Sequence, residues 1–397
     1  MSTKKTSDEI NKIGILGGGQ LAKMLAESCA GEDLSFISAD VAGSCAFKVT
    51  KPFTKDLSLG ENLDEFCELV DVVTFDSEHL GVEFANGIIK RELDVFPDYR
   101  FVQLSGDRFK EKTELNRLGI STAPFIKIDK NLNSDEISKL IINTLSSKNL
   151  SDSGIVIKTR HGGYDGKGQW VLKNGILDSE IKNLAIELSK LNSNPGLIIE
   201  GLINFGFECS IIASRSLNGE FITWPLIHNI HKDSILDISR CPINKETLNY
   251  ADEKNAQKIV KTICEEHNYV GTICVELFCT DTGLIVNEIA PRVHNSGHLT
   301  IEGSVTSQFK NHINAIRGQE LGPSDIIGSC AMINIVGYRP NDEALNYFEE
   351  TKCVYFHWYN KEVRPKRKVG HITIVAENDL ELESKIDHIN MLLGIRN

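Results

Sequence analysis

Long apolar runs are absent from this chain of 397 residues. No stretch approaches the roughly 18 to 20 apolar residues that a transmembrane helix requires. The N-terminal segment carries Lys4 and Lys5, but polar residues follow them where a secretory signal peptide has its apolar core. We therefore expect a cytoplasmic protein without a membrane partner, whose residues 1–11 form a flexible extension.

Cysteine clusters are also absent. The ten cysteines form no C-x-x-C pair and show none of the close spacing of a zinc site. Cys29, Cys67, Cys264 and Cys274 lie among apolar neighbours, as expected of reduced thiols in the core of a cytosolic protein. The cysteines therefore predict neither a disulfide framework nor a zinc site.

An excess of positive charge is lacking too. The formal net charge of -12 argues against a nonspecific nucleic-acid binder, because nothing in the balance would neutralise a phosphate backbone. Small anionic substrates remain compatible, since they need only a local basic pocket. The length exceeds what one compact core accommodates, so two to four packed domains are expected.

Strands and helices alternate in the first hundred residues. A short apolar strand at 13–16 runs into three glycines, a helix is expected over 21–30, and further strands are expected at 34–37 and 70–75. This succession predicts an open parallel sheet. Later elements are a surface helix at 136–145, strands at 155–158 and 170–172, a β-rich block at 197–224, a helix at 251–267, strands at 271–279 and 283–288, and a mostly β tail from 327 with a basic turn at 361–368.

The first glycine loop has two interpretations. Gly17, Gly19 and Ala22 fit G-x-G-x-x-[GA] between a strand and a helix, with Asp40 near the acidic position of a dinucleotide site. Such a loop lets backbone amides and a helix N-terminus meet a phosphate. The alternative is a tight turn without a ligand. Gln20 adds a side chain that a plain packing turn does not need.

A second glycine loop follows Lys158. Residues 159–169 combine four glycines with Tyr164, Asp165 and Lys167, a composition typical of a lid whose amides and ammonium groups close over phosphates. No G-K-[ST] follows at Walker spacing. A plain hairpin turn is the competing interpretation, but such turns rarely use so many glycines beside these side chains.

Two acids stand on neighbouring predicted strands. Glu276 and Glu288 are each flanked by apolar residues, and an acid in that setting is costly to bury unless it is paired or binds a cation. With Asn287 they make a hard oxygen site suited to Mg²⁺ that carries nucleotide phosphates. Two acids on a solvent-facing sheet surface are the weaker alternative.

Two further segments are rich in polar side chains. His294 and His298 are four residues apart, but Pro291 and Gly297 speak against a helical metal pair, so a loop facing the substrate is expected. Residues 361–368 form a dense basic run in an acidic protein. Such a run is usually a solvated turn, although its arginines can also bind a phosphate.

Five segments combine into a pattern that spans about residues 12 to 375. They are residues 17–21; Asp107, Arg108 and Lys112; residues 162–169; residues 287–292; and residues 294–298. Together they resemble the N5-carboxyaminoimidazole ribonucleotide synthetases, a family of ATP-grasp ligases. The Tyr-Asp-Gly-Lys-Gly-Gln lid and the Asn-Glu-Ile-Ala-Pro-Arg segment are specific in combination.

The resemblance implies an α/β (α+β) ATP-grasp fold with a Rossmann-like N-terminal domain and a small β-rich C-terminal domain. The implied divisions are the extension at 1–11, the Rossmann-like domain at 12–105, the lid domain at 106–205, the domain with the Mg²⁺ and ATP acids at 206–326, and the C-terminal domain at 327–397.

The resemblance also implies an ATP site. The phosphates would meet Arg108 and Lys158, and Mg²⁺, with Mn²⁺ as an alternative, would bind Glu276 and Glu288. The remaining implied ATP contacts are Gly163, Tyr164, Asp165, Gly166, Lys167, Gly168 and Gln169 in the lid, Glu200, Gly201, Leu202 and Ile203 at the adenine hinge, Glu208 at the ribose, and His231 and Asn287.

By the same resemblance, a second group of residues holds 5-aminoimidazole ribonucleotide. It comprises Gln20, Leu21, Glu78, Asn295, Ser296, Lys361, Arg364, Arg367 and Lys368. Arg292 and Tyr164 lie where bicarbonate chemistry is expected. The implied catalytic residues are Lys158, Tyr164, Asp165, Lys167 and Arg292.

The implied reaction is ATP-dependent carboxylation of this ribonucleotide with bicarbonate, through carboxyphosphate, in purine biosynthesis. A homodimer and a hand-off of product to a mutase are further expectations from the family. A formate-dependent glycinamide ribonucleotide transformylase of the same fold is the main alternative. An NAD-dependent oxidoreductase would use only the first glycine loop, and a non-catalytic nucleotide sensor would not need the intact lid lysines and both acids.

Overall fold

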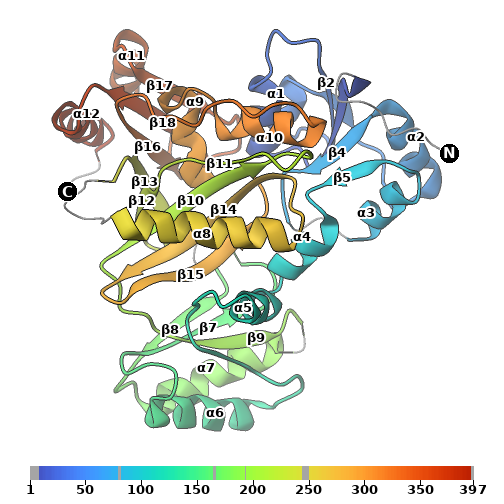
Figure 1. The fold of residues 1–397 in the computed structure, drawn as a ribbon. Coiled ribbons are helices and arrows are strands. Elements are labelled where there is room, and N and C mark those ends of the chain that lie inside the picture. The colour runs from blue at the N-terminus through green and yellow to red at the C-terminus, as the bar shows by residue number, and fades with distance from the viewer. Residues whose placement is uncertain (1–8, 79–81, 164–166, 193, 244–249, 395–397) are drawn as a thin grey trace.

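The computed structural model describes residues 9–78, 82–163, 167–192, 194–243 and 250–394 (Figure 1). Its strands form three sheets, one in each of three successive parts of the chain. The first part and the C-terminal strands lie at one end of the molecule in this view, and the lid part projects at the other end.

The first sheet confirms the predicted parallel arrangement, with strand order β3-β2-β1-β4-β5. Ile13 and Ile15 on β1 are fully buried, as is usual for a parallel strand that helices cover on both faces. The elements of this part are β1 (Lys12–Leu16), α1 (Gln20–Glu27), β2 (Ser35–Ala39), η2 (Cys45–Lys48), β3 (Lys51–Phe53), α2 (Gly60–Leu69), β4 (Val72–Phe75), α3 (Val82–Ile89), β5 (Asp94–Phe96) and α4 (Tyr99–Ser105).

The structure contradicts the predicted flexible extension at its last residues. Ile10 is buried in the core beside β1, and its carbonyl accepts a hydrogen bond of 2.9 Å from Arg317 Nε. The backbone amide of Asn11 donates to Asp71 at 2.9 Å. Apolar burial and these two hydrogen bonds hold this segment in place, while residues 1–8 lie outside the described residues.

The second sheet, in the order β6-β9-β7-β8, forms the lid part of the chain. Its predicted surface helix is confirmed as α6, which begins with a capping box between Asn133 and Glu136 and buries Ile137 and Ile141. The elements are α5 (Arg108–Arg117), β6 (Phe125–Lys127), α6 (Ser134–Ser147), β7 (Gly154–Thr159), β8 (Gln169–Lys173), α7 (Asp178–Leu191) and β9 (Leu197–Gly201).

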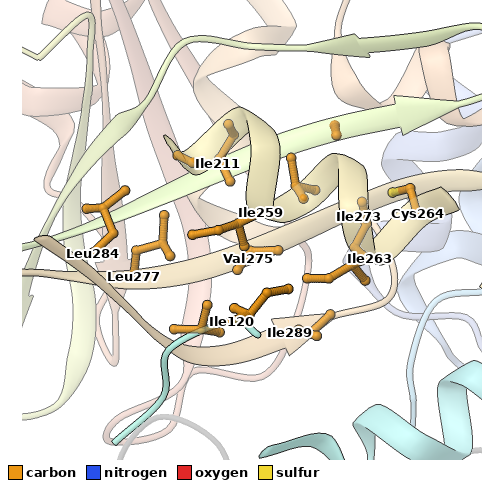
Figure 2. Close-up of a cluster of buried hydrophobic side chains, with 14 of the residues drawn as sticks. Ile120, Ile211, Ile259, Ile263, Cys264, Ile273, Val275, Leu277, Leu284 and Ile289 are labelled. Atoms are coloured by element: carbon orange, nitrogen blue, oxygen red, sulfur yellow. The ribbon is translucent and has the colours of Figure 1, made fainter. Parts of the chain in front are cut away.

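The third sheet runs in the order β15-β14-β10-β12-β13-β16-β18-β17, with β11 paired to β10. Helix α8 covers one face, where Ile259 and Ile263 pack in one cluster with Ile211 and Val275 (Figure 2). Burying each such side chain contributes roughly 1.5 to 3 kcal/mol. The elements before the C-terminal tail are β10 (Phe207–Arg215), β11 (Phe221–Thr223), β12 (Ile227–Lys232), β13 (Ile235–Cys241), α8 (Tyr250–Glu266), β14 (Gly271–Thr280), β15 (Gly283–Ala290), η3 (Asn295–Leu299), α9 (Thr300–Gly303) and α10 (Gln308–Arg317).

The prediction of a mostly β tail is wrong in part, because two helices alternate with its strands. Asn341 caps one helix by accepting from the Ala344 amide, and Asn378 caps the other by accepting from the Glu381 amide. The strands extend the third sheet, since β16 pairs with β13. The elements are β16 (Ser329–Val336), α11 (Asp342–Glu350), β17 (Val354–Trp358), β18 (Lys368–Ala376) and α12 (Asp379–Leu392).

All ten cysteines are free thiols. Cys29, Cys264 and Cys274 are buried as expected, and Cys67 is half-buried. Among the helices of the described part of the chain, none combines the length and apolarity that a membrane span needs.

Candidate active site

Lys158 lies at the base of the lid and points toward two other elements. It is two residues from Val156, which pairs with Glu200 across β7 and β9, so Lys158 and Glu200 share one face of the lid sheet. Lys158 Nζ is 2.9 Å from Glu200 Oε2 and donates to Asn287 Oδ1 at 3.3 Å. The predicted phosphate-binding lysine therefore joins the lid sheet to strand β15.

Arg108, at the start of α5, holds the lid loop against the same strand. Its guanidinium donates to the carbonyls of Thr159 at 3.0 Å, Gly162 at 2.6 Å and Gly163 at 3.1 Å. The same group lies 3.5 Å from Glu288 Oε2. Arg108 therefore lies where an incoming phosphate would meet both the lid and the acidic strand.

The lid loop depends on glycines with positive φ. Gly163 has φ +77°, and a Cβ there would lie 2.5 Å from the Lys167 carbonyl oxygen. Gly168 has φ +69°, and a Cβ there would lie 2.7 Å from Thr159 Oγ1. Lys167 is exposed, and Gln169 pairs in register with Lys158. Tyr164, Asp165 and Gly166 lie outside the described residues.

A β-bulge brings three polar residues of β15 and β14 together. Glu276 pairs with Glu288, but the next pair is Leu277 with Val286, so Asn287 is an extra residue on β15. Neighbouring residues of a regular strand point to opposite faces, and a bulge re-aims one of them. Asn287 can therefore reach Lys158 while Glu288 reaches Arg108.

Glu276 is ionised at neutral pH. Burial alone would raise the pKa of Glu276, but the hydrogen bond and charge of His294 lower it to about 2. His294 Nε2 lies 3.0 Å from Glu276 Oε1. His294, which we expected in a loop facing the substrate, therefore also contacts one of the two acids.

The two acids fit a magnesium ion that keeps other ligands. In the described part of the chain, no cluster of three or more His, Cys, Asp or Glu side chains is arranged to hold a metal ion. Mg²⁺ needs fewer, because it is usually bound by one or two carboxylates together with water and substrate phosphates. Glu276 and Glu288 on one face of the sheet match that requirement.

The predicted adenine hinge is the end of β9. A Cβ on Gly201 would lie 2.3 Å from the Leu150 carbonyl oxygen, so glycine is required there. The Leu202 carbonyl accepts from Ser151 Oγ at 2.7 Å, and Ile203 is half-buried. Glu208, on β10, forms an ion pair with His231 Nδ1, so these two predicted ATP contacts are adjacent.

The first glycine loop is occupied by side chains of the protein itself. The Gly18 amide donates to Asp40 Oδ2 at 2.8 Å, and the Gly19 amide donates to Asp76 Oδ2 at 2.7 Å. Burial raises the pKa of Asp76 to about 6, against the lowering effects of the Gly19 amide and of Arg292. Because carboxylates take the amides that a pyrophosphate would need, the structure favours the turn without a dinucleotide.

Two contacts join predicted ribonucleotide residues to distant parts of the chain, one of them to the predicted catalytic residue Arg292. Lys361 Nζ donates to Gln20 Oε1, although the two residues are 341 positions apart. Arg292 Nε lies 2.5 Å from Glu78 Oε2, and Arg292 Nη2 lies 3.1 Å from the other oxygen. The charges of Arg292 and Lys361 both lower the pKa of Asp76 against its burial, so both groups lie near that carboxylate.

The other predicted ribonucleotide residues range from fully buried to exposed. Leu21 is buried in the core beside β1. Ser296 is fully buried, and its hydroxyl lies 2.8 Å from Ser210 Oγ. The remaining side chains are Asn295, which exchanges amide hydrogen bonds with Asn334; Arg364, which is exposed and paired with Glu362; Arg367, which donates to the Glu362 carbonyl; and Lys368, whose charge lowers the pKa of Glu276.

Glu111 and Lys112 are contacts of the site to which the sequence assigned no role, although Lys112 belongs to one of the segments that carry the resemblance. Both are buried on α5, where Lys112 Nζ donates to the Asn287 carbonyl at 2.9 Å and Glu111 Oε2 accepts from the Ile289 amide at 3.0 Å. They follow Arg108 by three and four residues, which places all three on one face of the helix. This spacing is visible in the sequence and could have placed Glu111 and Lys112 beside Arg108.

Comparisons with known proteins agree with this architecture. Residues 10–105 match the ribonucleotide synthetase preATP-grasp domain, residues 113–309 the ATP-grasp domain, and residues 330–385 the phosphoribosylaminoimidazole carboxylase C-terminal domain. The N5-carboxyaminoimidazole ribonucleotide synthase of Vibrio cholerae is 33% identical over 96% of this chain and 95% of its own length.

Solved structures give the same result. The crystal structure of N5-carboxyaminoimidazole ribonucleotide synthetase from Thermus thermophilus is 34% identical, with a TM-score of 0.83 over 96% of this chain and 98% of that chain. The synthase from Aspergillus clavatus, in complex with ADP and 5-aminoimidazole ribonucleotide, is 25% identical, with a TM-score of 0.82 over 97% and 99%. These findings confirm the resemblance, and the chain belongs to the N5-carboxyaminoimidazole ribonucleotide synthase family of ATP-grasp ligases.

Proposed function

We propose that this chain uses ATP and bicarbonate to carboxylate 5-aminoimidazole ribonucleotide, yielding N5-carboxyaminoimidazole ribonucleotide, ADP and phosphate in purine biosynthesis. The observation that carries the proposal is the meeting of Lys158 and Arg108, at the lid base, with Asn287 and Glu288 on β15. A lid lysine and an arginine facing an acidic strand suit transfer of a phosphoryl group. The related N5-carboxyaminoimidazole ribonucleotide synthases indicate which amine receives the carboxyl group.

ATP would lie between the lid sheet and the face of the third sheet that carries Glu276. Lys158 and Arg108 would neutralise its phosphates, and the lid around Gly163 and Gly168 would close over them. The end of β9 would meet adenine, and Glu208 with His231 would meet the ribose. Related structures in complex with ATP or ADP support a nucleotide site in this fold.

Glu276 and Glu288 would hold Mg²⁺, which would neutralise charge on the transferred phosphoryl group when bound. Mn²⁺ is expected to substitute, because it prefers the same oxygen ligands. Glu276 is already ionised for binding a cation, because the hydrogen bond and charge of His294 lower its pKa to about 2.

The chemistry would proceed in two steps. A bicarbonate oxygen attacks the γ-phosphorus of ATP and the bond to ADP breaks, which gives carboxyphosphate. The exocyclic amine then attacks its carboxyl carbon, either directly or after release of CO₂, and phosphate and a proton leave. Arg292, held by Glu78, would orient the carboxyl oxygens. The lid would exclude water, because carboxyphosphate hydrolyses readily.

The ribonucleotide would lie between the first sheet and the C-terminal strands. Lys361 donates a hydrogen bond to Gln20 there. The charges of Arg367 and Lys368 contribute to lowering the pKa of Lys361, so both cations lie near it. Such a basic group suits a phosphate.

The first test is ADP release by the purified protein with Mg²⁺-ATP and bicarbonate, with and without 5-aminoimidazole ribonucleotide. The proposal expects release that requires both bicarbonate and the ribonucleotide. Activity with formate and glycinamide ribonucleotide instead would assign the transformylase, although the match at 330–385 favours the carboxylating enzyme. If neither the bicarbonate pair nor the formate pair supports ADP release, the chain would instead be a nucleotide sensor.

We also propose a cytoplasmic homodimer that hands its product to a mutase. A groove of about 1170 Å³ lies between α1, α10 and β17, and its lining includes Met24, Phe309 and Trp358 together with the largely exposed Val305. Such a partly apolar groove supports contact with a second copy. Sedimentation of the purified protein tests this, and a monomer at micromolar concentration would contradict it.

A further inference from the structure

Helix α5 contacts three consecutive residues of β15 with one face. Arg108 reaches the Glu288 carboxylate at 3.5 Å, Glu111 accepts from the Ile289 amide at 3.0 Å, and Lys112 donates to the Asn287 carbonyl at 2.9 Å. Side chains three and four positions apart lie on the same side of a helix. The strand that carries the nucleotide-facing residues is therefore held by α5 at each of these positions.

Lys112 is the most deeply placed of the three. Its side chain is 1% exposed, and its ammonium lies 3.5 Å from Glu200 Oε1. The other Glu200 oxygen is 2.9 Å from Lys158 Nζ. Glu200 is thus a buried carboxylate between two ammonium groups, one facing the nucleotide site and one enclosed behind it.

The charges in this group depend on one another. Burial alone would raise the pKa of Glu200, but Lys158 and Lys112 lower it below its ordinary value. Burial lowers the pKa of Lys112, and the charge of Glu200 opposes that effect. A buried charge is tolerated only while it is paired, so Glu200 needs a cation at every stage of the reaction cycle.

We propose that Lys112 is a positioning residue that stays paired with Glu200 and thereby frees Lys158 to leave that carboxylate for a nucleotide phosphate. The proposal rests on the proposed function, because it assumes a nucleotide beside Lys158. Without Lys112, Lys158 would be the remaining ammonium paired with Glu200, and the phosphate would compete with that ion pair. Lys112 acts on the nucleotide through Glu200 and does not touch it.

The test is calorimetric titration of the full chain with Mg²⁺-ADP. Lys112→Met is expected to weaken ADP binding about tenfold, because the ion pair between Lys158 and Glu200 must first be broken. Lys110→Met, which removes an exposed lysine from the same helix, is the matched control and should leave binding within about twofold of wild type. A folded Lys112→Met variant that binds ADP like wild type would overturn the proposal.

A second comparison separates positioning from a purely structural role and also serves if Lys112→Met does not fold. In Glu200→Gln, Lys158 no longer has a carboxylate to leave, so adding Lys112→Met should change ADP affinity by less than about threefold. A further loss beyond that would show that Lys112 does not act through Glu200. Wild-type ribonucleotide-dependent ADP release is measured in parallel: its absence would reject the proposed function, whereas unchanged affinity in the variants rejects only the role of Lys112.

Discussion

Arg292 and Glu78 form a two-point ion pair between the third sheet and the first, with Arg292 Nε 2.5 Å from one carboxylate oxygen and Nη2 3.1 Å from the other. Glu78 follows strand β4, and Arg292 follows strand β15. A two-point contact fixes the plane of a guanidinium as well as its position. This ion pair therefore fixes the orientation of the Arg292 guanidinium beside the ends of β4 and β15.

Glu78→Gln is expected to reduce ribonucleotide-dependent ADP release about tenfold to hundredfold, because Arg292 loses the charged partner that orients it. The affinity for Mg²⁺-ADP should stay within about twofold, since the nucleotide residues are untouched. Steady-state kinetics and calorimetry measure the two effects. Glu65→Gln, which breaks an exposed ion pair with Lys55, is the control and should change neither. Equal losses in turnover and ADP affinity would contradict a role confined to Arg292.

Glu276→Gln is expected to raise the Mg²⁺ concentration for half-maximal activity at least about tenfold, because a neutral amide replaces the ionised carboxylate that we propose as a metal ligand. A Mg²⁺ titration of ADP release checks this. Asp281→Asn, in the exposed turn of the same β14–β15 hairpin, is the matched control. If both variants need the same Mg²⁺ concentration as wild type, Glu276 is not a metal ligand.

Asp76→Asn should stabilise the protein more at pH 7.5 than at pH 5. The pKa of Asp76 is about 6 in the folded chain and 3.8 ordinarily, so the folded chain binds the proton more tightly than the unfolded chain does. The wild type therefore loses stability as pH rises from 3.8 to 6, whereas asparagine does not titrate. The variant should gain about 1 kcal/mol relative to wild type between pH 5 and 7.5.

The measurement is the difference in thermal unfolding midpoint between Asp76→Asn and wild type at the two pH values. Asparagine keeps an oxygen that can accept from the Gly19 amide, so the glycine loop should stay intact. A difference that is the same at both pH values would contradict a raised pKa for Asp76.

Lys361→Met is expected to raise the KM for 5-aminoimidazole ribonucleotide about tenfold, because one cation is lost from the group expected to meet its phosphate. The KM for ATP should change little. Lys366→Met removes an exposed lysine from the same turn and is the control. Should both variants behave alike, the run at 361–368 acts as a solvated turn, which was the alternative interpretation of this segment.

Local patterns predicted the elements whose partners are near in sequence. The strand at 13–16, its glycines and the following helix are found in the structure as β1, a turn and α1. Glu276 and Glu288 could be placed together because a short hairpin joins their strands. The two helices of the C-terminal tail were missed although Asn341 and Asn378 precede them as caps, since the apolar residues around them also suit strands.

The sequence by itself determined the family, the parallel sheet of the first part, the strands that carry Glu276 and Glu288, the helices α1, α6 and α8, and the residue types of the candidate nucleotide site. These depend on hydrogen bonds and side-chain periodicity within a few positions of the chain. Only the tertiary structure decided which charged and polar groups meet. Asp40 and Asp76 fill the glycine loop, Lys112 lies behind Glu200, and Lys361 reaches Gln20. Such pairings join segments separated by up to 341 positions, because buried charged and polar groups need partners that come within reach only after the sheets have packed together.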